Sequence, residues 1–204
     1  FRFNDPENLS SIELVSSRRY MLSPGEINPE EIRAIARTAK VSESPFSVEK
    51  IPFPQADNFE RVIDLLEFVA EGPRTTEDIA AEYEFVPRQS DYYFAALRYL
   101  GLGELEIGPE GVRVRKATDL GMKISALSFV QKRLELSKIL LKVSSVNQVF
   151  STFLQSGSYM TVDEVEKIVG LEREQEGISG ATVRRRAQTV LAWCKWLGSL
   201  GKTF

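Results

Sequence analysis

Histidine is absent from the 204-residue chain, and cysteine occurs once, as Cys194. Without histidine the chain cannot supply a histidine base, nucleophile or metal ligand, which excludes catalytic triads and histidine-based nucleases. A single cysteine excludes an intrachain disulfide and a cysteine-rich zinc site. Scarce cysteine is typical of the reducing cytoplasm, where we expect this protein. No apolar run approaches the ~18–20 residues of a membrane helix, so we expect no membrane partner.

Other catalytic signals are also scarce. A metal-dependent nuclease of the common restriction type needs an acidic residue followed by an acid-x-Lys pair on adjacent strands, and no predicted strand ends in such a pair. Glu49-Lys50 and Glu166-Lys167 are directly adjacent, so neither has the required spacing. A glycine-rich phosphate loop is missing too. We therefore predict no catalytic constellation, no metal site and no cofactor in this chain.

Charge is distributed unevenly along the chain, whose net charge is −3. Residues 57–127 hold 8 basic and 14 acidic side chains, a net charge of −6, whereas residues 128–204 hold 11 and 7, a net charge of +4. Phosphate contacts need clustered lysine and arginine, so an acidic chain argues against unspecific polyanion binding. It leaves room for a local basic surface, which we expect in the last third of the chain.

The first 56 residues form an N-terminal extension with one short helix. That helix begins at Asn28-Pro29-Glu30-Glu31 and runs to about Lys40. Asparagine is a favoured helix cap, and proline is favoured at the first helical position. Three prolines between Pro45 and Pro54 predict extended backbone. This proline-rich stretch separates the extension, residues 1–56, from the rest of the chain.

The remaining chain repeats one helical pattern. Apolar spacing predicts two sets of three helices. The helices of the first set lie at 58–71, from Thr75 or Thr76 onward, and at 87–100. Those of the second set lie at 146–153, from Thr161 onward, and at 181–197. The third helices align without a gap, because Arg98-Tyr99-Leu100-Gly101 matches Lys195-Trp196-Leu197-Gly198, with each glycine ending its helix. We therefore predict two modules, residues 57–123 and residues 124–204, the second opening with a long connecting helix over 124–142.

Alternating side chains predict a hairpin after the first three helices. Leu105 and Ile107 alternate with glutamates, and Val112 and Val114 alternate with arginines, on either side of a turn at 108–111. Glutamate on one strand facing arginine on the other would favour this pairing. Three helices and then a hairpin is the order of a winged helix. The predicted fold is thus mainly α with small β-hairpins, as two tandem winged-helix or helix-turn-helix modules plus the extension.

The third helix of a helix-turn-helix unit enters the major groove through its N-terminal residues. Arginine can read guanine there, glutamine can read adenine, and threonine can contact a thymine methyl. The expected DNA-binding residues are Arg88, Gln89 and Tyr92 in the first module, Arg113, Arg115 and Lys116 in its hairpin, and Thr182, Arg184, Arg185, Arg186, Gln188 and Lys195 in the second module. The same helical wheels place Tyr99, Thr189 and Trp196 outward, and Ser179 is a plausible cap for the last helix.

Several of these residues also have a purely structural explanation. Exposed arginines are often only solvated, and the hairpin cations could be partners of Glu104 and Glu106 instead of phosphate ligands. Trp193 and Trp196 fit core or interdomain packing better than base stacking. Cys194 lies on the apolar stripe of the last helix, where we expect an inert core residue.

Two stretches resemble winged-helix modules of bacterial restriction-modification proteins. The first is Val86-Pro87-Arg88-Gln89-Ser90-Asp91-Tyr92-Tyr93 through Tyr99-Leu100-Gly101-Leu102, and the second is Ser179-Gly180-Ala181-Thr182-Val183-Arg184-Arg185-Arg186-Ala187-Gln188-Thr189-Val190, followed by Trp193 and Trp196. The resemblance covers about 57–198. It implies that the modules bind DNA while a nuclease lies elsewhere on the polypeptide or on a partner, as in a type II restriction endonuclease. Val86 departs from the pattern, because a polar cap is expected before Pro87.

We expect sequence-specific binding of double-stranded DNA, as the target-recognition part of a restriction-modification or defence protein. The expected partners are double-stranded DNA and a nuclease domain or subunit, with a homodimer left open. One alternative is a transcriptional regulator of the same fold, which would have a defined operator. Another is a tandem winged-helix scaffold that binds protein and never DNA, which the net charge of −6 over residues 57–127 favours.

Overall fold

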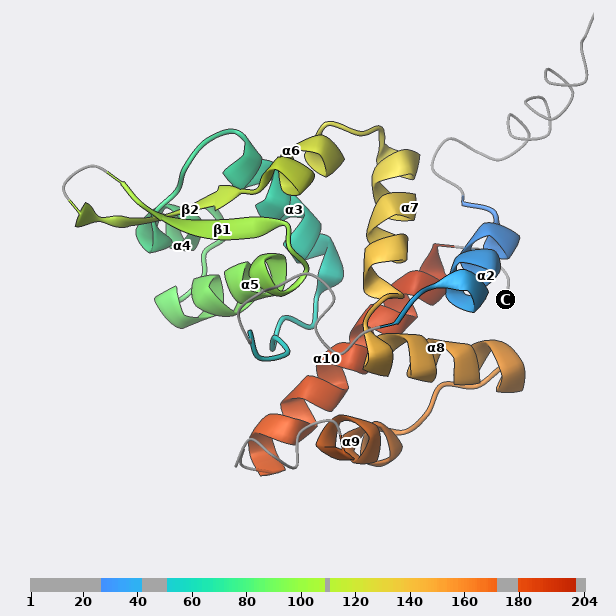
Figure 1. Ribbon diagram of the computed structural model, residues 1–204. Coiled ribbons are helices and arrows are strands. Elements are labelled where there is room, and N and C mark those ends of the chain that lie inside the picture. Colours follow the sequence, from blue (N-terminus) through green and yellow to red (C-terminus); the bar gives the residue numbers. More distant parts are fainter. Residues whose placement is uncertain (1–26, 42–50, 109–110, 172–179, 201–204) are drawn as a thin grey trace, which may run out of the picture.

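Helices dominate the computed structural model, which describes residues 27–41, 51–108, 111–171 and 180–200 (Figure 1). Within that part of the chain, the strands form a two-stranded antiparallel sheet. The elements in chain order are α2 (Pro29–Thr38), α3 (Phe59–Ala70), α4 (Thr76–Glu82), α5 (Pro87–Tyr99), β1 (Gly103–Ile107), β2 (Arg113–Ala117), α6 (Asp119–Ser125), α7 (Phe129–Leu140), α8 (Ser144–Ser156), α9 (Val162–Leu171) and α10 (Gly180–Ser199). The prediction of a mainly helical fold with a hairpin is confirmed.

The elements α3 to α6 with the hairpin form what we call the first unit. α3 buries one side, on which Phe59, Val62, Ile63 and Leu66 are each at most 3% exposed. Their spacing of three and four positions puts them on one stripe of the helix, and α5 and β2 pack around α3. The predicted helices and their order in this unit are therefore confirmed.

The hairpin forms where alternation predicted it, but with a different register. Glu104 lies opposite Lys116, and Glu106 lies opposite Val114, so glutamate does not face arginine. The strand β2 also pairs on its other side with a single residue between α3 and α4, because the backbones of Arg74 and Arg115 exchange hydrogen bonds of 2.8 and 2.7 Å. Arg115 therefore sits closer to the body of the unit than the sequence indicated.

Two helices, α6 and α7, connect the two halves. The connecting helix predicted over 124–142 is shorter than expected, because α6 ends at Ser125 and α7 runs only from Phe129 to Leu140. The side-chain oxygen of Thr118 accepts a hydrogen bond from the Gly121 backbone N–H at 3.1 Å, which caps α6. Gly121 packs so tightly that a Cβ there would lie 2.2 Å from the Leu102 carbonyl oxygen. This close approach holds α6 against the first unit.

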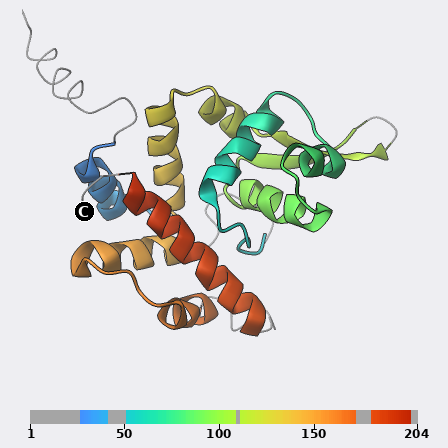
Figure 2. The same ribbon diagram turned by 180° about the vertical axis from the view of Figure 1, so that it is seen from behind.

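We call α7 to α10 the second unit, and α2 packs against its helices α7 and α8 (Figure 1). Gly157 ends α8 in the left-handed conformation with φ 72°. Seen from behind, α10 runs from beside α9 to beside α2 (Figure 2). It continues through Gly198 to Ser199, so the prediction that Gly198 ends it is wrong. The division into separate domains at residues 57 and 124 stays a prediction.

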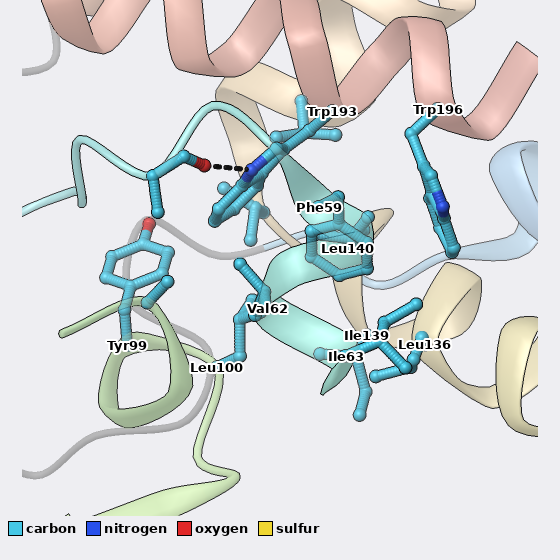
Figure 3. Close-up of a cluster of buried hydrophobic side chains, with 14 of the residues drawn as sticks. Phe59, Val62, Ile63, Tyr99, Leu100, Leu136, Ile139, Leu140, Trp193 and Trp196 are labelled. Carbon is cyan, nitrogen blue, oxygen red and sulfur yellow. Dashed lines mark hydrogen bonds between the residues drawn. The ribbon is translucent and has the colours of Figure 1, made fainter. Parts of the chain in front are cut away.

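Two tryptophans of α10 join the units (Figure 3). The Trp193 indole is fully buried and donates its N–H to the Ala56 carbonyl at 2.8 Å. The Trp196 indole donates to Glu60 Oε1 at 2.7 Å, and its ring lies 4.4 Å from that of Phe59, measured between centroids. The expectation that both tryptophans pack in the core or between modules is confirmed. Cys194, between them, is fully buried as predicted, and burial raises the pKa of its thiol.

Candidate nucleic-acid interface

The start of α5 presents polar side chains to solvent. Arg88 and Gln89 are both exposed in the first turn after Pro87. Val86 occupies the cap position without a side-chain hydrogen bond, and Gln89 Oε1 accepts from the Val86 N–H at 3.2 Å instead. The departure from a polar cap at Val86 is therefore offset by Gln89. The helix begins at Pro87, where the sequence predicted it.

Arg88 and Tyr92 act as a pair on the outer face of α5. The guanidinium of Arg88 donates from Nε to the Tyr92 hydroxyl at 2.5 Å and lies 5.3 Å from the centre of its ring. A ring partner four residues along the helix limits the rotamers of the arginine. The hydrogen bond and the ring contact therefore restrict the Arg88 side chain on the exposed face of α5.

The start of α10 is tied to α9 by Arg184. Its Nη1 lies 2.8 Å from Asp163 Oδ1 and 2.9 Å from Glu166 Oε2. The hydrogen bond to Asp163 and the charge of Glu166 raise the pKa of Arg184. Two carboxylates therefore neutralise the cation that we expected to contribute to DNA affinity. Arg184 is exposed as predicted, but it bridges two helices of its own unit.

A separate stripe of α10 faces solvent beside Arg184. Arg185, Gln188 and Lys195 are all exposed, with half-buried Ala192 between the last two. Offsets of three, seven and ten positions from Arg185 place these residues along one side of a helix. We call Arg185, Gln188 and Lys195 the α10 stripe. Thr182, one turn earlier, is half-buried.

Several residues predicted to face outward are instead buried. Arg186 is only 6% exposed, so the expectation that it projects toward DNA is wrong. The helical wheels likewise placed Tyr99 of α5 outward, at 2% exposed, and Thr189 and Trp196 of α10, at 1% and 7%. Tyr99 packs against Phe53, with 5.2 Å between the ring centroids. The residues of α10 are buried because this helix is covered on several sides, by α8, by α9 and by α3. A helical wheel with a single buried side cannot represent such a helix.

The hairpin offers less positive charge than its sequence suggests. Arg115 is only 9% exposed, donates to Asp91 Oδ1 at 2.7 Å and lies 5.6 Å from the ring centre of Phe94, so its guanidinium is held inside the unit and is not exposed on the hairpin. Lys116 Nζ lies 2.5 Å from Glu106 Oε2 and 3.3 Å from Glu104 Oε1, as the structural reading proposed. Hydrogen bonds to both glutamates raise the pKa of Lys116. Arg113 remains exposed on the hairpin.

Sequence reasoning missed the ion pairs that connect α3 with α7. Lys132 pairs with Glu67, and Arg133 Nη2 lies 2.5 Å from Glu60 Oε2. Lys132 is 7% exposed. Acidic residues three and four positions apart on α3 and adjacent cations on α7 were visible in the sequence, but no local pattern tells which distant helix a charged face meets. The predicted cap Ser179 and the loop after Leu171 lie outside the described residues.

No cluster of three or more metal-ligating side chains occurs in the described part of the chain. Among the same residues, no helix is both long enough and apolar enough to cross a membrane.

The fold is therefore that of a mainly helical protein with a two-stranded hairpin and two exposed polar helix faces. A family model, described as a domain of unknown function (DUF7226), matches residues 61–202, and the chain belongs to this family. The searches of curated proteins and of solved structures returned no match.

Proposed function

We propose that this chain binds double-stranded DNA through the N-terminal half of α5 and through the α10 stripe, as two winged-helix or helix-turn-helix modules in tandem. Arg88 and Gln89 would enter a major groove from α5, and Arg185 with Gln188 would do so from α10. Lys195 would contact phosphate. The resemblance of 86–102 and 179–190 to restriction-modification modules supports a role in target recognition for a restriction-modification or defence protein, with a nuclease supplied elsewhere.

The order of elements in the first unit supports this proposal. α3 is followed by the bridging residue Arg74, by α4, by α5 and then by the β1–β2 hairpin. A helix-turn-helix with a small sheet at its side places the third helix, here α5, at the surface that meets DNA. In the second unit, α8, α9 and α10 follow the same helical order without a described hairpin.

The placement of the two third helices also supports it. α5 and α10 both begin toward the same side of the molecule, on the left in Figure 1, and this holds in the reverse view (Figure 2). Arginine and glutamine occupy the early, exposed positions of both helices, which suits bidentate contacts to guanine and adenine. The single observation that carries the proposal is this matching exposure of Arg88 with Gln89 and of Arg185 with Gln188.

The direct test is a mobility shift of the chain on labelled duplex DNA, repeated across a salt series from about 50 mM upward. Phosphate contacts release counterions, so the logarithm of the affinity should fall linearly with the logarithm of the salt concentration. Arg88→Ala should weaken binding, whereas Lys167→Ala on the exposed side of α9 should not. A chain that binds no duplex at about 50 mM salt would refute the proposal. A preference for one defined operator would favour the transcriptional regulator.

A second candidate function is a scaffold that binds protein. Exposed apolar side chains on the hairpin favour it, since Leu105 is 39%, Val112 46% and Ile107 65% exposed. Large apolar side chains in solvent are typical of surfaces that meet another protein. Failure to bind duplex, together with stable co-purification of one partner that is lost in Ile107→Ser, would select the scaffold.

A further inference from the structure

The outer edge of β1 has no strand beside it in the part of the chain that the structure describes. Among those residues, β1 pairs with β2 and with no other strand, and β2 is bridged on its far side by Arg74. The hairpin projects beyond α4 and α5 in both views (Figure 1, Figure 2). An unpaired strand edge presents backbone N–H and C=O groups with which another strand can form hydrogen bonds.

The register of the hairpin determines which backbone groups of β1 point outward. Next to the turn, the Gly108 N–H donates to the Val112 carbonyl at 2.8 Å. Hydrogen-bonded pairs recur at every second residue of an antiparallel ladder, so the residues two and four positions before Gly108 also bond to β2. The N–H and C=O groups of Leu105 and Ile107 therefore point away from β2. The hydrogen bonds of Arg115, which lies opposite Leu105, to the backbone between α3 and α4 agree with this alternation.

The two faces of this edge carry different side chains. Leu105 and Ile107 lie on one face and are 39% and 65% exposed. Exposed Arg113 shares that face, because it lies opposite Ile107. The other face carries Glu104 and Glu106, since successive side chains of a strand point to opposite faces. A strand beside β1 would therefore meet apolar side chains and a cation on one face and two carboxylates on the other.

The carboxylate face keeps an excess of negative charge although Lys116 lies on it. The Lys116 ammonium lies 3.3 Å from Glu104 Oε1 and 2.5 Å from Glu106 Oε2, so one oxygen of each carboxylate stays outside these contacts. The glutamate side chains are 51% and 50% exposed. Because a carboxylate can accept several hydrogen bonds, a cation on a neighbouring strand would add to Lys116 without displacing it.

The same glutamates disfavour a second copy of this chain as the neighbour. Two β1 strands can bond antiparallel through the outward backbone groups of Leu105, and Glu104 of one copy then lies opposite Glu106 of the other. Four carboxylates would share that face with two lysines. Like charges directly opposite each other destabilise a strand pair. The edge is therefore better suited to a strand of different sequence that brings cations to this face.

We propose that the outer edge of β1 binds an extended segment of a partner protein as an antiparallel third strand, in which basic side chains alternate with apolar ones. The basic side chains lie beside Glu104 and Glu106, and the apolar ones lie beside Leu105 and Ile107. Strand addition of this kind gains affinity from main-chain hydrogen bonds and specificity from alternate side chains. The site uses none of the α5 and α10 residues proposed to bind DNA, so the inference does not rest on that function.

The probe for this site is a fluorescein-labelled peptide of alternating valine and lysine. Its fluorescence anisotropy is measured with the full chain in the absence of DNA. A matched peptide carries glutamate in place of every lysine. The lysine peptide should bind at least about tenfold more tightly, because its cations lie beside two carboxylates. Equal affinity for the two peptides, or no binding of the lysine peptide, would overturn the proposal.

Backbone methylation of the peptide tests the strand geometry itself. Directly opposite residues of an antiparallel pair share a face, so valines opposite Leu105 and Ile107 turn their N–H groups toward β1, and the lysines turn theirs to solvent. N-methylation of the central valines should therefore weaken binding at least about tenfold, whereas N-methylation of the central lysines should weaken it less than about twofold. Equal losses, or a larger loss from the methylated lysines, would contradict an antiparallel third strand.

Two matched double variants of the protein test whether the charge effect is local. Glu104→Gln with Glu106→Gln should weaken binding of the lysine peptide about tenfold, because Lys116 then repels its cations. Glu77→Gln with Glu82→Gln, at exposed positions of α4, removes the same net charge and should leave the affinity unchanged. Equal losses in both would refute a local site. If the unlabelled chain forms a dimer that displaces the peptide, the occupant is a second copy and the proposal is wrong.

Discussion

Trp196 on α10 donates its indole N–H to the carboxylate of Glu60 on α3 at 2.7 Å, across 136 positions of sequence. Glu60 also lies 2.5 Å from Arg133 on α7, so one carboxylate connects three helices from both units. The apolar contact beside it, between Trp196 and Phe59, excludes water from part of this junction. The relative placement of the two units thus rests on a polar contact that is supported by aromatic packing.

The buried tryptophan at this junction should contribute more stability than the polar contact. Trp193→Ala removes a fully buried ring and its hydrogen bond to Ala56, so we expect a loss of about 3–5 kcal/mol in the free energy of unfolding. Glu60→Gln keeps an oxygen acceptor for Trp196 but weakens the pair with Arg133, and should cost about 1 kcal/mol. Urea denaturation followed by far-UV circular dichroism measures both. A larger loss for Glu60→Gln than for Trp193→Ala would contradict this ranking.

Two glycines provide a matched test of packing around α6. A Cβ at position 121 would lie 2.2 Å from a backbone carbonyl, whereas a Cβ at Gly170 in α9 meets no atom within 4 Å. Gly121→Ala should therefore destabilise the protein by about 3 kcal/mol or more, because backbone must move. Gly170→Ala should be neutral or stabilise by up to about 1 kcal/mol through helix propensity. Thermal melts compare them, and a neutral Gly121→Ala would show that α6 is not held as described.

The protein should lose stability at acidic pH because the carboxylates of Asp78 and Glu164, each at the start of a helix, become protonated. Thr75 donates its backbone N–H to Asp78, and Thr161 donates its N–H and hydroxyl to Glu164, which lowers the pKa of each carboxyl from 3.8 and 4.5 respectively. A carboxyl with a lower pKa in the folded state stabilises the protein above its unfolded pKa, and that stability is lost as the pH falls through the folded pKa.

The combined Asp78→Asn and Glu164→Gln variant should therefore melt below the wild type at pH 7, with the difference shrinking from about pH 5 downward. Glu82→Gln, an exposed change at the other end of α4, should keep the wild-type profile. Melting temperatures measured from pH 7 to pH 3 provide the comparison. Parallel profiles for the wild type and the double variant would exclude these two caps as the source of acid sensitivity.

Arg115 should fasten the hairpin to α5 instead of contacting a ligand. Its buried guanidinium bonds to Asp91 at 2.7 Å, and its backbone pairs with Arg74. Asp91→Asn leaves a buried cation with a weaker acceptor, so we expect a loss of about 1–3 kcal/mol. Arg113→Ala, on the exposed part of the same strand, should change stability by less than about 0.5 kcal/mol. Denaturant midpoints distinguish these outcomes. Equal midpoints for Asp91→Asn and the wild type would show that the Arg115–Asp91 pair does not hold the hairpin to α5.

Local signals in the sequence were enough to predict where most helices form, but not which of their residues other elements would bury. Asn28 before Pro29 and the stripe from Phe59 to Leu66 predicted α2 and α3 because caps and apolar spacing act within a few residues. Arg186 was misplaced because its burial depends on helices distant in sequence. Gly198 did not end α10, because a glycine inside a helix costs only about 1 kcal/mol and packing against Tyr159 can offset it.

The candidate site shows the same division between local and distant causes. Exposure of Arg88 and Arg185 agrees with their predicted positions, since each lies early in its helix. The neutralisation of Arg184 by Asp163 and Glu166 depends on how α9 packs on α10. Likewise, the pairing of Arg115 with Asp91 depends on the register of the hairpin, which a one-residue difference in turn geometry changes.

The most direct test of the central claim compares two neighbouring arginines of α10. Arg185 lies on the exposed α10 stripe, whereas Arg184 is held by two carboxylates of α9. In duplex DNA mobility shifts across a salt series, Arg185→Ala should weaken binding by about tenfold and reduce the salt slope by about 1. Arg184→Ala should leave the slope nearly unchanged. Equal slopes for wild type and Arg185→Ala, or a larger effect of Arg184→Ala, would contradict DNA binding through the α10 stripe.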